Sequence, residues 1–421
     1  MTSDNFETSV SGPAALITAI PALLGFVPER SLVLITFEGS GDEIGTTMRH
    51  DLTLEPDGRP TELMLGVIDH LSRVCESYSP TRVMAVIIDD RMDPHGHAYR
   101  RLAAVIDRHL LAVGGLYGAF WTSAISLGRQ WITLWDRRSE VIESDRIADG
   151  VVGDPMISPV AIARAVTGGR RVLMTRGEIL DNLSPLPHCE SPDCDANEIS
   201  TIDDHDYDEL LESKLKQVAR DDRSDIADDD GAASISGPVD QTTIDPAVLA
   251  DFAGTGAGRV PLHLLVEQVR RMQERSDLEF VLDLIARACG DLGCDDLRRL
   301  DKSLRELYVR DALVSLAVTD LWSDAEHLFT QATRRLRGRG QAAAATLLGF
   351  VHYVHGNGAM AGTAFDVALE ASPGYSMATL YNDALTRGIP PSVINRCAET
   401  GYVVARTLGV ELPPPILRPA A

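Results

Sequence analysis

The chain has 421 residues, of which 44% are hydrophobic and 24% charged, the composition of a globular protein long enough for two domains. No apolar run approaches the roughly 20 residues of a membrane-spanning helix, and a net charge of −23 disfavours a phosphate backbone as partner. We therefore expect neither membrane nor nucleic-acid binding. The acidic opening lacks the basic stretch of a secretory signal, which favours a cytoplasmic location.

Strand and helix patterns alternate over the first 186 residues. Two continuous apolar runs, 32–38 and 83–90, are typical of strands buried on both faces. Further strands are predicted at 44–54, 116–125 and 129–135, the last two as a hairpin across SLG. Helices are predicted at 12–25, 60–76 and 97–115, with two more between 158 and 185. Residues 1–186 are thus predicted to form an α/β layer domain with a mixed sheet.

An acidic segment follows at residues 187–257. Between Glu190 and Pro246 it holds 18 acidic and 4 basic residues, a net charge of −14. With few large apolar side chains, it cannot bury enough surface to offset the entropy of ordering it, and we expect a largely disordered linker. One stretch, 207–220, has a helical pattern with Glu212 and Lys216 at i,i+4.

Helical patterns fill residues 258–410 and are followed by a proline-rich, flexible tail at 411–421. The most informative stretch is 342–373, which predicts two helices joined by a tight turn. In this stretch, the small residues, the aromatic residue and the proline that ends the second helix have the spacing of a tetratricopeptide-type (TPR-like) helical pair. A degenerate copy is offset by 36 residues. The residues involved are Leu348, Gly349, Ala361, Phe365, Ala368 and Pro373, with Ala325, Phe329 and Ala332 in the second copy. The fold class is α/β plus all-α.

Several blocks together resemble the Domain of Unknown Function 4192 family of actinomycete proteins. They are LLGFVPERSLVLI, SPVAIARAVTGG with TRGEIL, YVRDALV, and GNGAMAGTAFDVALEASPGYSMATLYNDALTRGIPPS. The resemblance covers roughly residues 10–186 and 255–392. It implies an α/β part followed by a helical part, and it implies no activity. Many members carry a Cys-Cys-Pro cluster soon after the glycine-arginine-tryptophan element. Here the matching GRQWITLW is followed by DRRSEVIESDR, which contains no cysteine, so a metal or redox role tied to that cluster is not expected.

The best candidate for a ligand site is DDRMDPHGH, directly after the strand at 83–90. Ligands of open α/β sheets bind at the carboxyl ends of strands, and carboxylates with histidines can bind a cation or transfer protons. The opposing interpretation is an ordinary acidic helix N-terminus in a turn. The candidate residues are Asp89, Asp90, Asp93, His95 and His97, to which Arg49, His50 and Asp51 of the neighbouring strand are added.

The cysteines and glycines suggest weaker sites. HCESPDC places His188 beside Cys189 and Cys194, and Cys289 and Cys294 repeat the C-x4-C spacing. Thiol ligands of zinc usually come as tighter pairs, so we expect no metal and no cofactor. GTGAG (254–258) follows a helix rather than a strand, which excludes a dinucleotide loop. The arginines of RRLRGRG (334–340) are expected at a solvated helix end.

Two functions remain open. The first is a noncatalytic binding or scaffold protein whose helical repeats hold a protein or peptide in a groove. The candidate groove residues are His352, Tyr353 and His355. The alternative interpretation is that these side chains are buried in the core. The second is an enzyme or small-ligand sensor with its site at the strand ends. The repeat spacing and the lack of a recognisable catalytic constellation favour the first. The tryptophans are expected in the core or between domains, with a recognition surface as the alternative, since tryptophan is favoured at binding hot spots.

Overall fold

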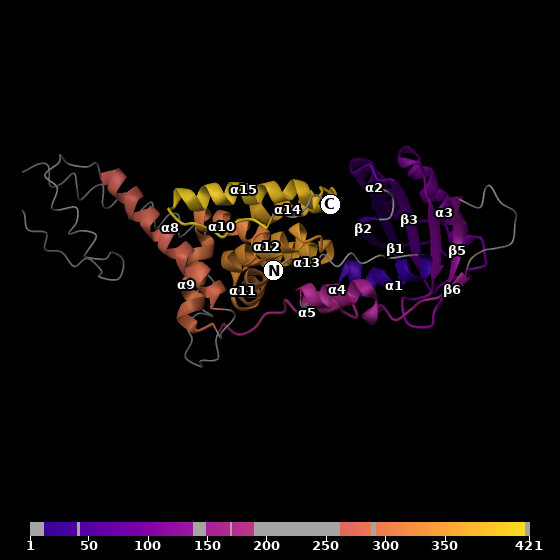
Figure 1. Cartoon of the computed structure of the whole chain (residues 1–421), viewed down its shortest axis with the longest axis horizontal. Coiled ribbons are helices and arrows are strands. Elements are labelled where there is room, and N and C mark those ends of the chain that lie inside the picture. Colours follow the sequence, from indigo (N-terminus) through magenta and orange to yellow (C-terminus); the bar gives the residue numbers. More distant parts are fainter. Residues whose placement is uncertain are drawn as a thin grey trace, which may run out of the picture.

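The computed structural model describes residues 12–39, 43–137, 149–168, 171–188, 262–287 and 292–416. Figure 1 shows a sheet with helices on both faces at one end of the molecule and a helical part at the other. This is the predicted α/β plus all-α layout. Apart from Pro187 and His188, the expected linker lies outside the described residues. Within them, no helix is both long and apolar enough to cross a membrane.

The N-terminal part contains a mixed sheet, as predicted, whose six strands in the described residues lie in the order β2-β1-β3-β4-β5-β6. The pair β3–β4 is parallel because α3 carries the chain back between the two strands, and the other neighbouring pairs are antiparallel. The strands are β1 (Ser31–Glu38), β2 (Glu43–Asp51), β3 (Arg82–Ile88), β4 (Gly118–Thr122), β5 (Gln130–Asp136) and β6 (Asp149–Val151). The predicted hairpin is β4–β5.

Helices cover both faces of this sheet. Leu32 and Leu34 of β1 pack with α2 and α3, whereas Val33 and Ile35 pack on the opposite face with α1. Burial on both faces explains why four successive residues of the strand, Leu32 to Ile35, are all apolar. The helices are α1 (Pro13–Leu24), α2 (Glu62–Tyr78), α3 (Ala98–His109), α4 (Pro159–Gly168) and α5 (Gly177–Asp181), with 3-10 turns η1 (Leu111–Val113) and η3 (Pro155–Ile157).

The helical part is packed around α12, in which every residue from Gly340 to Val354 is buried. The repeated triplets, one on α11 and one on α13, are buried as well. The helices are α8 (Leu262–Ala286), α9 (Cys294–Arg305), α10 (Leu307–Leu313), η6 (Val314–Val318), α11 (Trp322–Arg335), α12 (Gly338–Val354), α13 (Gly358–Ala371), α14 (Ser376–Thr386) and α15 (Pro391–Thr407). Since α12 also contacts α9, α14 and α15, it has no open face on which a groove could form.

The first part of the predicted tail, residues 411–416, contacts the helical part. The flexibility of residues 411–421 stays a prediction. The Ile416 amide donates a hydrogen bond to the Val318 carbonyl at 2.7 Å, and the Tyr402 hydroxyl donates to the Pro413 carbonyl at 2.6 Å. Proline cannot continue a helix, but its carbonyl still accepts hydrogen bonds, so composition did not reveal this contact.

The two parts meet where α1 and α4 reach the start of α13, and Figure 1 shows α4 between them. The Arg164 guanidinium donates to the carbonyls of Ala22 and of Leu23, the latter at 3.3 Å, and to Asn357 Oδ1 at 2.7 Å. A second contact joins His70 Nε2 to the Thr386 carbonyl at 2.6 Å. One side chain of α4 therefore holds both the end of α1 and the N-cap residue of α13.

We expect Arg164→Ala to lower the free energy of unfolding by about 2 kcal/mol, because several acceptors lose one charged donor. Urea denaturation measures this loss, and hydrogen exchange should become faster in the first turn of α13. Arg171→Ala, at an exposed arginine of the same segment, is the control. Equal effects of the two substitutions would contradict a specific role of Arg164 at the interface.

Candidate functional site

Asp89 directly follows β3 and is fully buried on the α2–α3 face of the sheet. Its Oδ1 accepts a hydrogen bond from Arg91 Nε at 2.6 Å, and its Oδ2 accepts one from the Tyr99 hydroxyl at 3.0 Å. The Trp121 indole donates to its backbone carbonyl at 2.9 Å. Burial, followed by the charge of Asp89, raises the pKa of Tyr99 to about 12, so this hydroxyl stays a donor at neutral pH. Both carboxylate oxygens are therefore engaged inside the protein.

The other residues of the DDRMDPHGH loop do not converge on Asp89. Asp90 is exposed and forms an ion pair with Arg30 at 3.1 Å, a contact that lowers the pKa of Asp90. Asp93 Oδ1 accepts from the His95 amide at 3.0 Å, as an acidic residue does in a turn. His95 and His97 are exposed. In the part of the chain that the structure describes, no three His, Cys, Asp or Glu side chains are placed to hold a metal ion together.

The pair Arg49–Asp51 lies on the opposite face of the sheet from Asp89. Arg49 is paired in register with Val33, which packs on the α1 side. Its guanidinium contacts Asp51 at 2.5 Å and the Ser31 hydroxyl at 2.8 Å, and burial lowers the pKa of Arg49. His50 alternates to the other face, opposite Leu32. The structure thus divides the strand-end candidates between the two faces; whether any of them binds a ligand stays a prediction.

The groove candidates use their polar atoms within the helical part. Tyr353 is buried, and its hydroxyl donates to the Ile389 carbonyl at 2.6 Å. His352 is buried with its Nδ1 3.9 Å from Glu326 Oε1. His355 stacks on Trp322 at 4.1 Å between ring centroids, with its Nε2 3.0 Å from the Ala317 carbonyl. These three positions therefore stabilise the packing around α12.

The arginines of RRLRGRG also contact backbone. Arg334 donates to the Ser184 carbonyl at 3.2 Å, and Arg337 donates to the Leu186 carbonyl at 2.8 Å. The Leu186 amide in turn donates to the Arg334 carbonyl at 2.7 Å. These contacts attach the end of the N-terminal part to the end of α11. The sequence analysis predicted a solvated helix end and did not predict these contacts.

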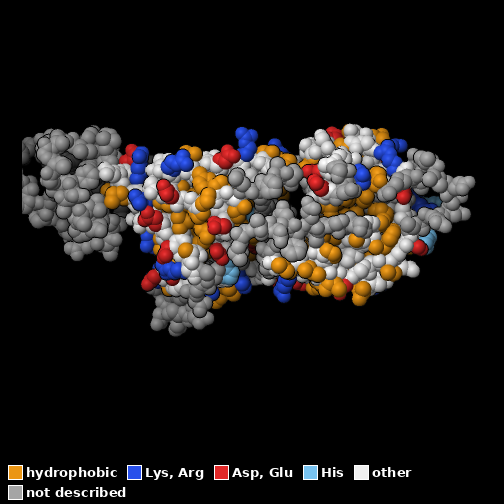
Figure 2. Space-filling model, viewed as in Figure 1, with side chains coloured by type: hydrophobic (Ala, Val, Ile, Leu, Met, Phe, Trp, Pro, Cys, Tyr) orange, Lys and Arg blue, Asp and Glu red, His pale blue; other side chains and the backbone are white. Residues whose placement is uncertain are grey.

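A surface that the sequence analysis did not single out lies on α4. The outward face of this helix consists of Pro159, Ile162, Ala165 and Val166, and the exposed fractions of Ile162 and Val166 are 51% and 74%. Ile157, just before α4, is 66% exposed. Surface helices normally place polar residues outward. Figure 2 shows hydrophobic side chains gathered over α4 and α1 along the lower edge of the N-terminal part. We call Ile157, Pro159, Ile162, Ala165 and Val166 the α4 face.

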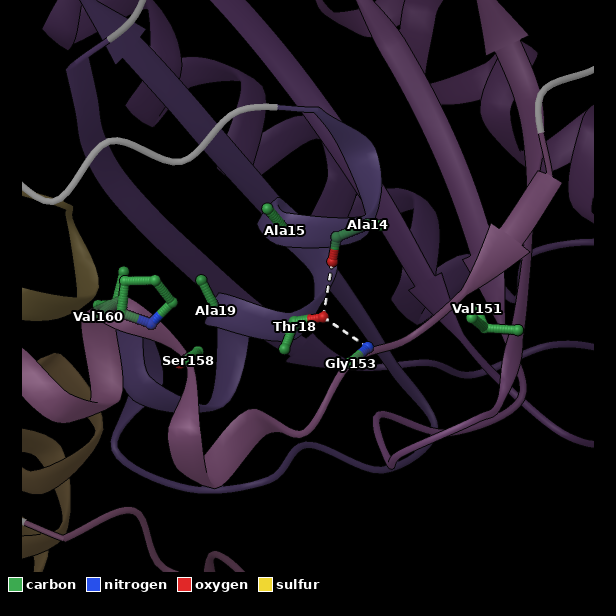
Figure 3. Close-up of a pocket in the computed structure, with 9 residues that line it drawn as sticks. Ala14, Ala15, Thr18, Ala19, Val151, Gly153, Ser158 and Val160 are labelled. Carbon is green, nitrogen blue, oxygen red and sulfur yellow. Dashed lines mark hydrogen bonds between the residues drawn. The ribbon is translucent and has the colours of Figure 1, made fainter.

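A pocket of about 260 Å³ adjoins the α4 face between α1, the end of β6 and the start of α4. Small side chains line it, among them Ala15 and Ala19, and Pro159 belongs to both the pocket and the α4 face. Figure 3 shows Thr18 facing Gly153, whose amide donates to Thr18 Oγ1 at 2.9 Å, while that hydroxyl donates to the Ala14 carbonyl at 2.6 Å. The polar groups at the pocket are thus satisfied by each other. Most of the lining side chains are apolar.

The comparisons with known proteins give one match. A family model described as "Domain of unknown function (DUF4192)" matches residues 13–392, which include α1, the sheet, α4 and the helices through the start of α15. Neither the curated proteins nor the solved structures contain a match to the chain.

Proposed function

The chain belongs to the family described as domain of unknown function DUF4192, and from its exposed apolar surface we propose that it is a noncatalytic, cytoplasmic binding protein whose protein partner docks on the α4 face. The observation that carries this proposal is the outward face of α4, which bears no charged side chain. An amphipathic helix of a partner would bury this face and place one apolar side chain in the adjoining pocket.

Charge indicates what kind of helix would bind. The exposed arginines Arg171 and Arg176 follow α4, and residues 151–180 carry four arginines against two acidic residues in a chain of net charge −23. We therefore propose a partner helix with acidic flanks, since charge complementarity favours association. The helical part, which we propose derives from TPR-like pairs, supports this surface through Arg164 rather than supplying an open groove.

The test uses the full chain as bait in extract of its source cells. Wild-type protein should retain one defined protein, which is then purified and titrated against each variant by calorimetry. Ile162→Glu combined with Val166→Glu should weaken the measured affinity at least about 10-fold, because two charges would be buried without partners. Leu127→Glu, at a side chain 71% exposed elsewhere on the same part, is the matched control.

Three outcomes would contradict the proposal. The retained protein could bind the double variant as tightly as wild type. Sedimentation could show a dimer that the double variant abolishes, which would assign the α4 face to a second copy of the chain. The isolated segment 207–220 could bind the α4 face in competition, which would assign it to the chain itself.

A further inference from the structure

The strand β2 forms one edge of the sheet, because β1 is its only neighbour among the described strands. Natural proteins protect such edges with short strands, proline or lysine. The opposite edge, β6, is three residues long, whereas β2 has nine residues and contains neither proline nor lysine. Each of its seven central residues is half-buried rather than enclosed. A long strand of the described sheet is therefore open to pairing with another extended chain.

The register with β1 shows which main-chain groups of β2 lie on the outer edge. The Leu52 amide donates to the Arg30 carbonyl at 2.7 Å, and Met48 pairs with β1 in the same register. Hydrogen-bonded pairs alternate along an antiparallel ladder, so the main-chain groups of Met48 point to β1 and those of Thr47 and Arg49 point outward. No residue that the structure describes forms a hydrogen bond with these outward N–H and C=O groups.

One side of α2 flanks this edge. Four residues at helical spacing share that side, namely Leu63, Val67, His70 and Val74. His70 and Val74 contact the end of α14 and the turn after it, and Figure 1 shows β2 as the strand nearest to the helical part. This side of α2 therefore faces the same way as the outer edge of β2. Val67 and Met48 are partly buried against one core, and Leu63 is 65% exposed.

The other face of an added strand would meet polar groups. Arg49 lies opposite Val33 and so directs its side chain to the α1 face. There it is paired with Asp51, and the charge of Arg176 acts on it electrostatically. A strand added to β2 would thus find apolar surface on the α2 side and charged groups on the α1 side. This environment fits a segment in which apolar and polar side chains alternate.

We propose that the outer edge of β2 binds an extended amphipathic segment of a partner protein, whose main chain pairs with Thr47 and Arg49 and whose apolar side chains cover Leu63. A second copy of the chain fits less well, because the helical part lies on this side of the sheet and would stand between two β2 strands brought edge to edge (Figure 1). Binding at this edge is independent of helix docking on the α4 face.

The experiment uses the full chain and a phage-displayed library of random linear peptides. Peptides retained by wild type are depleted on Thr47→Pro, in which the ring removes an outward amide but no hydrogen bond to β1. A peptide that survives depletion should alternate apolar and polar residues. In calorimetry it should bind Thr47→Pro at least about 10-fold more weakly than wild type. Thr47→Val keeps the amide and is the matched control, with unchanged affinity.

Two further measurements do not depend on whether Thr47→Pro folds. Leu63→Glu should weaken peptide binding at least about 10-fold, because a charge would be buried without a partner. Leu127→Glu and the double variant of the α4 face should leave the affinity unchanged. In hydrogen exchange followed by NMR, the amides of Thr47 and Arg49 should exchange fast in the free chain and slowly in the complex.

Three results would overturn the proposal. No peptide could survive the depletion on Thr47→Pro. Thr47→Val could weaken binding as much as Thr47→Pro, which would assign recognition to the side chain instead of the main chain. The amides of Thr47 and Arg49 could already exchange slowly in the free chain, which would show that the edge is covered by the chain itself or by a second copy; sedimentation separates these two.

Discussion

We expect Gly349→Leu to lower the free energy of unfolding by about 3 kcal/mol, measured by urea denaturation. Gly349 lies in the middle of α12, where a Cβ atom would stand 2.4 Å from Cε1 of the fully buried Phe365 on α13. Leucine is a better helix former than glycine, so helix propensity alone predicts a gain. The expected loss therefore measures how closely α12 and α13 approach each other.

Gly66→Leu is the matched control for this prediction. Gly66 is an exposed glycine within α2, and no atom lies within 4 Å of the position that its Cβ would take. There the same substitution should raise stability by about 0.5–1 kcal/mol. Combining Gly349→Leu with Phe365→Ala should cost less than the sum of the two single losses, because the smaller side chain makes room for the larger. A stabilising Gly349→Leu would show that the two helices are farther apart than described.

Local periodicity predicted the elements well, because each signal lies within a few residues. The strand β1 follows from a short continuous apolar run, and the hairpin β4–β5 follows from two strand patterns joined by one turn. The burial of α12 could also be predicted from its sequence, because a helix with apolar residues on all sides is normally a buried helix. The repeat spacing drew attention to the helical pair but does not determine which helices close over it.

The candidate site could be predicted only in part. Successive residues after a strand point to opposite faces, so the separation of Asp89 from Asp90 follows from sequence. That Arg49 lies away from Asp89 depends on the register Val33↔Arg49, which is set by tertiary pairing. The α4 face was missed for a similar reason: SPVAIARAV reads as a core helix, and only the fold leaves Ile162 and Val166 exposed.

Asp89→Ala is expected to lower the free energy of unfolding by about 3 kcal/mol. The substitution removes the carboxylate that accepts from the buried Tyr99 hydroxyl and from Arg91 Nε, while Arg91 Nη2 keeps the Leu52 carbonyl as its acceptor. A buried donor that loses its partner costs more than the bond contributed. Because the Arg91 side chain is 34% exposed, water compensates part of the loss, which places the effect at the lower end for a broken buried pair.

Two further variants separate the role of Asp89 in stability from ligand binding. Tyr99→Phe removes one of the two side-chain donors and should cost about 1 kcal/mol. Asp90→Asn affects only an exposed ion pair and should leave the urea midpoint unchanged within error. If Asp89→Ala instead unfolds at the same urea concentration as wild type, the Asp89 carboxylate does not stabilise the fold through these bonds.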